Sequence, residues 1–566
     1  MKKIYFLVLL FCLNVTLGLA KSKNIEFNVS LVSVEGKMML KVKATYAANK
    51  SGITKLEYKN EFWGETDLYK CLQSIKVLHQ GATVTMDSEN DQLILNHAKE
   101  IKNLIVEYLI QQDNGDKNLL GAEYRPVINE TYFSLFGWQL FLFPKLTDTQ
   151  HKTNFNITIN WEGFSSDYTI LNSFGATQKQ QIISNETCAE FTMSRFVGGN
   201  YRFKRSKISN KNVVIAMHGE WNHFNLQDYI DANTDIIEAV TTFWNDTERL
   251  DYTIFLSEIE DPKQSEDINR STVVGTGLTN SFSAFATSNV NLPTKLFCHE
   301  YLHNWIGGKI KNINEEEQYW FSEGFTEYYT VKLMSKFGIG GNPKTDFIIK
   351  INEVIKKHWQ SKVNQAPNSE ISTESFWNDT AYEQLPYDRG LLYAFYLDQK
   401  IYATSKGKYS LDNVMHALLT SAVDNNKKIT HNHFIKTLNK FLNVNVKKEF
   451  VDFIENGNLI PLARFFKAHK IQFDPEIKKL KLLGVYFKNG NQIEVINKDS
   501  KAEKSGLKEG DIFVDYDNDT KPGAVSNYKI LRNGKTMVFS ILRDYELFKI
   551  PQMVVNDTNL KKLGIN

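Results

Sequence analysis

Cysteine is scarce in this sequence, which limits how the fold can be held together. Only 4 of the 566 residues are cysteines, and three of them, Cys71, Cys188 and Cys298, lie beyond the N-terminal segment. An odd and low number of cysteines does not provide a disulfide framework. Cys71 and Cys188 remain candidates for one pair in an oxidising compartment, whereas Cys298 is expected to be a small buried hydrophobic residue.

The sequence also lacks an excess of charge of one sign. The formal net charge is +2, and no block of basic residues occurs. The composition therefore gives no indication of a nucleic-acid partner. Internal repeats and low-complexity linkers are absent as well, so the chain is not expected to be a repeat protein.

Long apolar runs are missing except at the N-terminus. Two lysines precede an apolar run from Ile4 to Leu13, and small residues follow at Gly18 and Ala20. This pattern is typical of a cleaved signal peptide over residues 1–20, which would place the protein in the periplasm or outside the cell. A retained N-terminal anchor is the alternative, and no later segment is apolar enough to span a bilayer.

The chain is too long for one hydrophobic core, and its pattern changes along the sequence. Residues 21–175 alternate apolar and polar positions between clusters of Asn, Gly and Asp, which predicts an N-terminal β-sandwich-like domain. Residues 176–475 are helical in much of their length, and residues 476–545 return to short strands with glycine turns. Residues 546–566 are expected to be a C-terminal tail. The predicted fold class is multidomain α+β.

Proline and glycine mark the expected limits of helices in the central segment. We expect a helix over residues 226–248, followed by a strand at Tyr252–Leu256. Further helices are predicted from about Pro293 to Gly307, from about Ser322 to Phe337 and from about Pro386 to Ala403.

Residues 299–303 form the metal-binding motif HExxH. On a helix, positions i and i+4 share one face, so His299 and His303 can reach one ion. Glu300 lies one residue further round, where its carboxylate can take a proton from a metal-bound water without binding the metal. We therefore predict one catalytic Zn²⁺ per chain, with Glu300 as the general base.

A second helix beyond this motif contains the candidate third ligand, Glu323. Three protein ligands leave one coordination position for water, as catalytic zinc requires, whereas a structural site more often uses cysteine and none is suitably spaced. Glu327 follows one turn later on the same face. It is either the carboxylate that accepts the second N–H of His299 or an exposed helix charge.

The motif and the segment Trp320-Phe-Ser-Glu323-Gly-Phe-Thr-Glu327 together resemble the glutamate-zincin peptidases. They are similar both to the aminopeptidase N and leukotriene hydrolase group and to the glycyl aminopeptidase family. The latter combines an N-terminal β domain, a thermolysin-like catalytic domain and a C-terminal PDZ domain. The resemblance implies a thermolysin-like, mostly α catalytic domain over residues 176–475 and a PDZ-like β domain over residues 476–545.

A further segment, Ala381-Tyr-Glu-Gln-Leu-Pro-Tyr387-Asp-Arg-Gly390, resembles the part of these families that contains their catalytic tyrosine. The tyrosine before the acidic, basic and glycine residues corresponds to Tyr387. A phenol there can donate a hydrogen bond to the oxyanion that forms during peptide hydrolysis. Without the resemblance, Tyr387 is equally well interpreted as a core aromatic residue.

One segment departs from the family pattern. Family members carry a Gly-Gly-Leu-Glu-His-like edge strand whose glutamate binds the α-amine of the substrate. The corresponding residues here are Gly277, Leu278, Thr279 and Asn280. The glycine suits a backbone that lies close to a peptide, but a neutral hydroxyl at Thr279 cannot make the charge-assisted contact that an ammonium needs.

The C-terminal segment resembles a PDZ domain only in part. Lys481–Val485 is similar to the carboxylate-binding loop, and the stretch from Ala502 to Asp511 matches the short helix and the strand after it. Only about sixteen residues separate Asp511 from Tyr528, which is short for the helix that lines a PDZ peptide groove. The domain is therefore either a binder of peptide C-termini or a structural module.

The sequence thus predicts a secreted zinc metallopeptidase that acts on peptides or proteins and is aminopeptidase-like with altered N-terminal recognition. A zinc endopeptidase and a non-catalytic PDZ-containing binding protein are the alternatives. The motif, Glu323 and Tyr387 argue against the last, because a non-catalytic scaffold has no need to keep them together.

Overall fold

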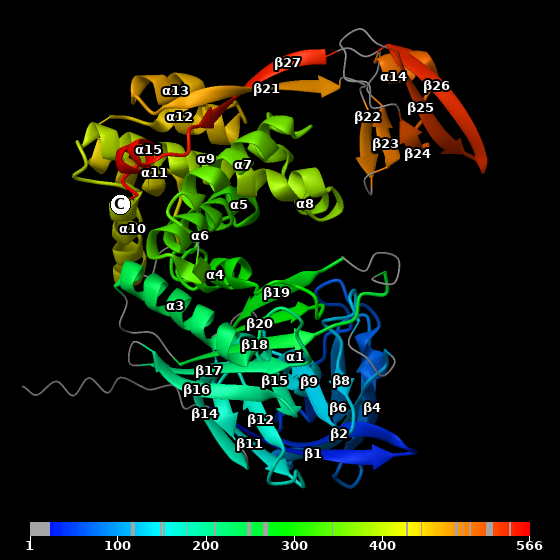
Figure 1. Cartoon of the computed structure of the whole chain (residues 1–566). Coiled ribbons are helices and arrows are strands. Elements are labelled where there is room, and N and C mark those ends of the chain that lie inside the picture. The colour runs from blue at the N-terminus through cyan, green and yellow to red at the C-terminus, as the bar shows by residue number, and fades with distance from the viewer. Residues whose placement is uncertain are drawn as a thin grey trace, which may run out of the picture. The chain divides into compact units, whose positions relative to one another are not determined.

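The computed structural model describes residues 23–565 except for 115–118, 148–149, 151–152, 178, 209–210, 246–250, 264–269, 342, 426–427, 443, 482–484, 489–490, 497–499, 517–524 and 543–544. The predicted signal peptide, residues 1–20, lies outside the described residues. The chain forms two compact units, Met1–Tyr301 and Leu302–Asn566, and each is described by itself (Figure 1).

The first unit begins with three sheets that share one hydrophobic core. The six-stranded sheet has the order β14 (Gln180–Thr187), β11 (Asn154–Glu162), β1 (Lys23–Val34), β2 (Lys37–Ala47), β7 (Asn103–Gln111) and β4 (Leu72–Val77). The four-stranded sheet contains β10 (Phe143–Pro144), β3 (Ile53–Glu57), β6 (Gln92–Asn96) and β5 (Thr83–Asp87). The five-stranded sheet contains β13 (Gly175–Thr177), β12 (Thr169–Asn172), β15 (Arg195–Gly199), β9 (Tyr132–Phe136) and β8 (Val127–Ile128). Short helices η1 (Leu68–Cys71), α1 (Gly137–Leu140) and α2 (Cys188–Thr192) connect them.

The alternation of apolar residues explains these strands. In β7 every second side chain is buried, which is the pattern of a strand with one face on a core. Phe27 of β1 packs at 4.5 Å, between ring centroids, on Phe141 in that core. The prediction of an N-terminal β-rich domain is therefore confirmed, but this part of the fold does not end at residue 175. Strand β14 pairs antiparallel with β11, with Thr187 opposite Asn154 at one end and Gln180 opposite Asn160 at the other. The six-stranded sheet therefore needs residues beyond 175.

The first unit continues with a mixed sheet in the order β16 (Arg202–Ile208), β17 (Lys211–His218), β18 (Tyr252–Glu258), β20 (Ser281–Ala286) and β19 (Val273–Leu278). Strand β19 is the edge strand and runs antiparallel to β20. Helix α3 (Leu226–Trp244) precedes β18, and helix α4 (Thr294–Leu302) follows β20. Figure 1 shows α3 along this sheet, next to β17 and β18. Both helices end earlier than predicted, α3 because Asn245 adopts a left-handed conformation with φ 48°.

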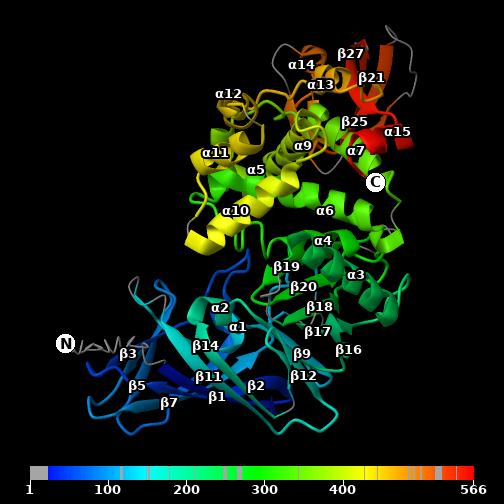
Figure 2. The same ribbon diagram turned by 90° about the vertical axis from the view of Figure 1, so that its left-hand side faces the viewer.

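The second unit is mostly helical (Figure 2). Its helices are η2 (Glu316–Gln318), α5 (Tyr319–Ser322), α6 (Gly324–Phe337), η3 (Ile339–Gly341), α7 (Asp346–Gln360), η4 (Asn368–Glu370), α8 (Thr373–Asn378), α9 (Thr380–Thr404), α10 (Leu411–Asn425), α11 (His431–Leu442), α12 (Lys447–Phe450), the π-helical η5 (Val451–Glu455) and α13 (Leu462–Ala468). The long helix α9 packs against α5, α6, α7, α8 and α10, so it forms the centre of this bundle. None of the helices in the described part of the chain is long and apolar enough to cross a bilayer.

Of two further predicted helices, one begins earlier than expected and the other is confirmed. Helix α9 begins at Thr380 and not near Pro386, because the Asp379 side chain caps it by accepting a hydrogen bond of 2.8 Å from the Ala381 N–H. Pro386 lies inside the helix, where it leaves one carbonyl without its helical donor. The helix expected from about Ser322 to Phe337 is confirmed as α6, and the short helix α5, which was not predicted, precedes it and meets it at Glu323.

The C-terminal part consists of a two-stranded ribbon and a small sheet. Strands β21 (Phe473–Lys481) and β27 (Tyr545–Met553) pair with each other, and helix α15 (Asp557–Lys562) follows. The small sheet contains β22 (Val485–Lys488), β23 (Gln492–Ile496), β24 (Ile512–Tyr516), β25 (Val525–Arg532) and β26 (Lys535–Leu542), with α14 (Lys501–Ser505) between β23 and β24.

Residues 546–566 are therefore not the simple tail that the sequence suggested. Strand β27 returns the chain to the helices, where Met553 accepts a hydrogen bond of 2.8 Å from Asn352 and Leu563 accepts one of 3.2 Å from Gln399. Leu482–Gly484, most of the expected carboxylate-binding loop, lies outside the described residues.

The three cysteines beyond the N-terminal segment are free thiols. Cys71 and Cys298 are buried, as expected for Cys298, and Cys188 is half-buried. The possible pair of Cys71 with Cys188 is therefore absent from the described structure. Burial raises the pKa of both of these thiols, that of Cys188 to about 12.

Candidate metal centre

Helix α4 presents the HExxH motif because its other face is apolar. Phe297 and Tyr301 pack on the sheet, with ring centroids 5.4 Å from Phe282 and 5.3 Å from Tyr252, respectively. Since side chains four residues apart share a face, this packing turns His299 away from the sheet. The helix ends at Leu302 and not near Gly307. His303 therefore stands just beyond the last helical residue.

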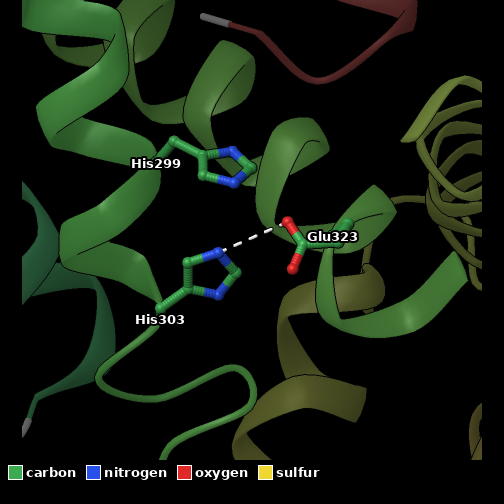
Figure 3. A group of neighbouring side chains, drawn as sticks. All are labelled: His299, His303 and Glu323. Carbon is green, nitrogen blue, oxygen red and sulfur yellow. Dashed lines mark ion pairs between the residues drawn. The ribbon is translucent and has the colours of Figure 1, made fainter. Parts of the chain in front are cut away.

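The structure brings together the three predicted metal ligands. The candidate donor atoms of His299, His303 and Glu323 all lie within 4.8 Å of one another. His303 Nε2 lies 3.5 Å from Glu323 Oε2. Figure 3 shows both imidazoles projecting from one segment toward the Glu323 carboxylate. His299 is buried, and the other two are half-buried.

Neighbouring backbone groups orient these side chains. His303 Nδ1 lies 3.2 Å from the Ile306 carbonyl, which favours a proton on Nδ1 and leaves Nε2 as the ligand atom. Glu323 stands at the junction of α5 and α6, where its N–H donates to Tyr319 O at 2.9 Å. This junction fixes the place from which the carboxylate extends.

Strand β19 holds the predicted general base. The Gly277 N–H donates a hydrogen bond of 2.9 Å to Glu300 Oε2. A methyl group added at Gly277 would lie 3.3 Å from the same oxygen, so the glycine permits this close approach. The sequence singled out Gly277 as a substrate-binding residue, but its contact with Glu300 is a further role that no motif indicates. The charge of Glu300 also acts on Tyr124. Burial raises the pKa of Tyr124 to about 12, and the negative charges of Glu123 and Glu300 contribute to this increase.

The remaining predicted substrate-binding residues occupy different surroundings. Leu278 ends β19 and is buried in the core of the first unit. Thr279 and Asn280 form the turn to β20, not the edge strand itself. The Thr279 N–H donates to Met193 O at 2.8 Å, and Asn280 has a positive φ of 49°. Both backbones are thus engaged within the protein, and the half-buried Thr279 side chain is the part that can contribute to recognition.

The tyrosine predicted to be catalytic lies on α9, which approaches α5 and α6 closely. A methyl group added at Gly324 would lie 2.4 Å from Gly390 Cα and 2.8 Å from Pro386 O. The residue before Tyr387 therefore lies against the helix that follows Glu323. Tyr387 is half-buried, whereas the hydroxyl of Tyr382 is engaged with Glu370 Oε2 at 2.9 Å.

Glu327 lies in the first turn of α6, and its N–H donates to Glu323 O at 2.8 Å. It is half-buried. This position agrees with the geometry assumed from the sequence, in which Glu327 follows Glu323 by one turn.

The donor set fits zinc. Two imidazole nitrogens and one carboxylate oxygen form the three-ligand combination found in catalytic zinc sites. One of these ligands, His299, is buried, which favours a metal ion bound to the protein over a fully hydrated ion. No cysteine contributes to the group of donors in the described part of the chain.

Comparison with known proteins relates the segment that contains these residues to a peptidase family. Residues 266–453 match the peptidase family M1 domain. Over these residues the chain is similar to the peptidase domain of the M1 family. This domain contains the HExxH motif, Glu323 and Tyr387. It includes β19 and β20, but neither the other strands of their sheet, β16, β17 and β18, nor the C-terminal β-sheet.

Two known proteins are similar to this chain over very different lengths. The leucine aminopeptidase 2 of Ajellomyces capsulatus is 25% identical over 134 residues, which are 22% of this chain and 21% of that protein. The chain thus matches about a fifth of the length of this curated relative. The crystal structure of an aminopeptidase N family protein from Idiomarina loihiensis has a TM-score of 0.75 at 15% identity and covers 96% of this chain and 99% of its own. The multidomain fold of the chain is therefore similar to that of this protein over nearly the whole length of both.

Proposed function

We propose that this M1-domain protein hydrolyses peptide bonds as a zinc aminopeptidase with altered recognition of the substrate N-terminus. The observation that supports this most strongly is the convergence of His299, His303 and Glu323 within 4.8 Å. It occurs inside the segment that matches the M1 peptidase domain.

The three ligands would hold one Zn²⁺, which, when bound, polarises a water molecule and lowers its pKa. Glu300 then accepts the proton of that water, with its carboxylate oriented by the Gly277 N–H. Tyr387 donates its phenolic hydrogen to the oxygen that becomes negatively charged as the peptide carbonyl is attacked. Glu327 is proposed to accept the second N–H of His299 and so to fix that ring.

Strand β19 is suited to bind the substrate backbone. It is the last strand of its sheet, and within the described residues no strand pairs with its outer edge. An extended peptide can add to such an edge through main-chain hydrogen bonds. The peptide would then run past Glu300, because Gly277 of the same strand contacts that carboxylate at 2.9 Å.

Recognition of the N-terminus is where we expect a difference from related aminopeptidases. Thr279 stands where the resemblance places a carboxylate that binds the α-amine. A charge-assisted hydrogen bond contributes roughly 1.5–3 kcal/mol, so its loss lowers the preference for a free amine by about one to two powers of ten.

This difference is tested by comparing kcat/KM on matched peptides with free and acetylated N-termini. We expect the natural protein to show little preference and Thr279→Glu to shift cleavage toward free N-termini. Thr279→Gln is the matched control, since it adds a similar volume without the charge. A strong preference for the free amine that Thr279→Glu leaves unchanged would show that another group binds the amine.

An endopeptidase is the second candidate, and Thr279 is the observation that favours it. A peptide-library digest read by mass spectrometry, with free and N-blocked peptides in parallel, separates the candidates. Loss of single N-terminal residues supports the aminopeptidase, and internal cleavage supports the endopeptidase. Absence of any cleavage by zinc-loaded protein would favour the binding protein.

We also propose that residues 476–545 form a PDZ-like module, as in the glycyl aminopeptidase family. The five-stranded sheet with α14 between β23 and β24 supports this, since a short helix was expected near Ala502. Whether the module binds a peptide C-terminus or is structural can be tested by titrating the full chain with C-terminal peptides and their amidated counterparts.

Export is the last part of the proposal. The N-terminal pattern of two lysines, an apolar run and small residues supports a cleaved signal over residues 1–20. Sequencing of the mature N-terminus after cell fractionation would give Lys21 as the first residue. An intact Met1 would instead indicate a retained anchor.

A further inference from the structure

A buried arginine in α9 lies two residues after Tyr387 and is only partly satisfied. Arg389 is 3% exposed. Its Nη2 donates a hydrogen bond of 2.5 Å to Ala366 O, and Gly457 lies so close that an added methyl group would be 2.9 Å from Nη2. The other terminal nitrogen, Nη1, is buried and has no hydrogen-bond partner in the described structure.

A second unsatisfied nitrogen belongs to the same site. His358, near the end of α7, is 5% exposed, and its Nδ1 is buried without a hydrogen-bond partner. Both side chains line one small cavity, together with Trp359, Leu392 and Asn458. The centre of a bound water molecule or small ion could lie within about 10 Å³ of this cavity. The cavity therefore has room for one such species and is too small for an organic ligand.

The surroundings of this cavity are positive. Burial lowers the pKa of Arg389 to about 10, so the guanidinium is still protonated at neutral pH, and burial lowers the pKa of His358 to about 3, so the imidazole is neutral. None of the described residues that line the cavity is acidic. The carboxylate whose charge acts on Arg389 is that of Glu370, which is exposed and accepts a hydrogen bond from Tyr382.

A buried charge such as that of Arg389 is unfavourable unless it is paired. Arg389 and His358 both have an unsatisfied nitrogen beside the same small cavity. We propose that this cavity binds one small monovalent anion, a halide ion such as chloride, held by Arg389 Nη1 and His358 Nδ1. Such an ion would connect α7, α9 and the segment around Gly457. It would thereby stabilise the part of α9 on which Tyr387 lies.

The first test uses the natural full-length protein and chloride itself. Thermal unfolding is measured in mixtures of sodium chloride and sodium gluconate at constant ionic strength, because gluconate is too large to enter the cavity. We expect the melting temperature to rise with chloride and to level off, by roughly 2 °C or more overall. Arg389→Met should lose this rise, whereas Lys406→Met, which removes an exposed cation after the same helix, should keep it.

The second test does not depend on how the variants fold. Crystals of the natural protein soaked in bromide should show an anomalous peak within hydrogen-bond distance of Arg389 Nη1. A water molecule there, together with a melting temperature set by ionic strength alone, would overturn the proposal. A bromide peak without any response of the melting temperature would identify an adventitious ion only and would also overturn it.

Discussion

Two of the three side chains of the candidate metal centre lie at the end or the junction of helices. His303 follows the last residue of α4, and Glu323 lies between α5 and α6. At such positions a side chain is less constrained by neighbours in the preceding turn, while the backbone is still fixed by the element. Local hydrogen bonds then set the direction, as Ile306 O does for His303.

The role of Glu300 leads to the first prediction at this scale. Glu300→Gln should keep the metal, because residue 300 is not a ligand, but should lower kcat/KM by roughly a hundredfold to ten-thousandfold, because an amide cannot accept the proton. Peptide hydrolysis and the zinc content of the same preparation are measured together. A variant that keeps zinc and full activity would remove Glu300 from the mechanism.

Tyr387 gives the second prediction. Tyr387→Phe should lower kcat by roughly a hundredfold while KM changes little, since the lost hydrogen bond forms only as charge develops on the substrate oxygen. Tyr382→Phe is the control on the same helix, because its hydroxyl contacts the exposed Glu370 at 2.9 Å and should matter little. If the two variants exchanged these phenotypes, Tyr382 would be the catalytic tyrosine.

At this scale the sequence predicted which residues come together, but not all of their contacts. The spacing within residues 299–303 was enough to place two histidines near one ion, because helical geometry relates positions four apart. The bond from Gly277 to Glu300 joins a strand to a helix. It depends on how α4 packs on the sheet, and neither residue's local sequence contains that information.

At the scale of elements, the position of Tyr387 depends on two glycines. A methyl group added at Gly390 would lie 1.9 Å from Trp320 O and 2.7 Å from Gly324 Cα. Helix α9 can approach α5 and α6 this closely only because side chains are absent at both points. The same contact keeps the helix of Tyr387 next to the residue that provides the third ligand.

Gly390→Ala should therefore separate these helices. We expect a loss of roughly 1–3 kcal/mol in the free energy of unfolding from overpacking, and weaker zinc binding, because Glu323 adjoins the displaced helix. Urea unfolding and zinc titration measure the two effects. Glu383→Ala, at an exposed position of α9, should change stability by less than about 0.5 kcal/mol. Equal behaviour of the two variants would show that the glycine contact does not position the site.

Helix limits were predicted less well than helix existence. The sequence indicated a helix through Tyr387, but proline was taken as its start. The Asp379 cap places the start at Thr380. Pro386 is tolerated inside the helix because the packing of α9 against several other helices offsets the hydrogen bond that Pro386 cannot make. By contrast, the helix expected from about Ser322 to Phe337 was placed correctly as α6, and only the short helix α5 before it was not predicted.

For the whole molecule, the order of the segments was predictable and their boundaries were not. Strand β1 pairs in parallel with β11, and β21 pairs with β27, across long stretches of intervening chain. Alternating hydrophobicity predicts that a strand exists, but it does not name a distant partner. For this reason residues 176–199 were assigned to the wrong domain and residues 546–566 to a tail.

The proposed chemistry depends on a zinc ion held by His299, His303 and Glu323. The most direct measurement is the zinc content per chain of the natural protein and of Glu323→Ala, determined by inductively coupled plasma mass spectrometry after dialysis against a weak chelator. Because three ligands are needed to retain the ion, we expect about one zinc per natural chain and a large loss of zinc from the variant. Circular dichroism should show that both proteins are folded. A folded variant with full zinc occupancy, or a natural protein that binds no zinc, would contradict the account.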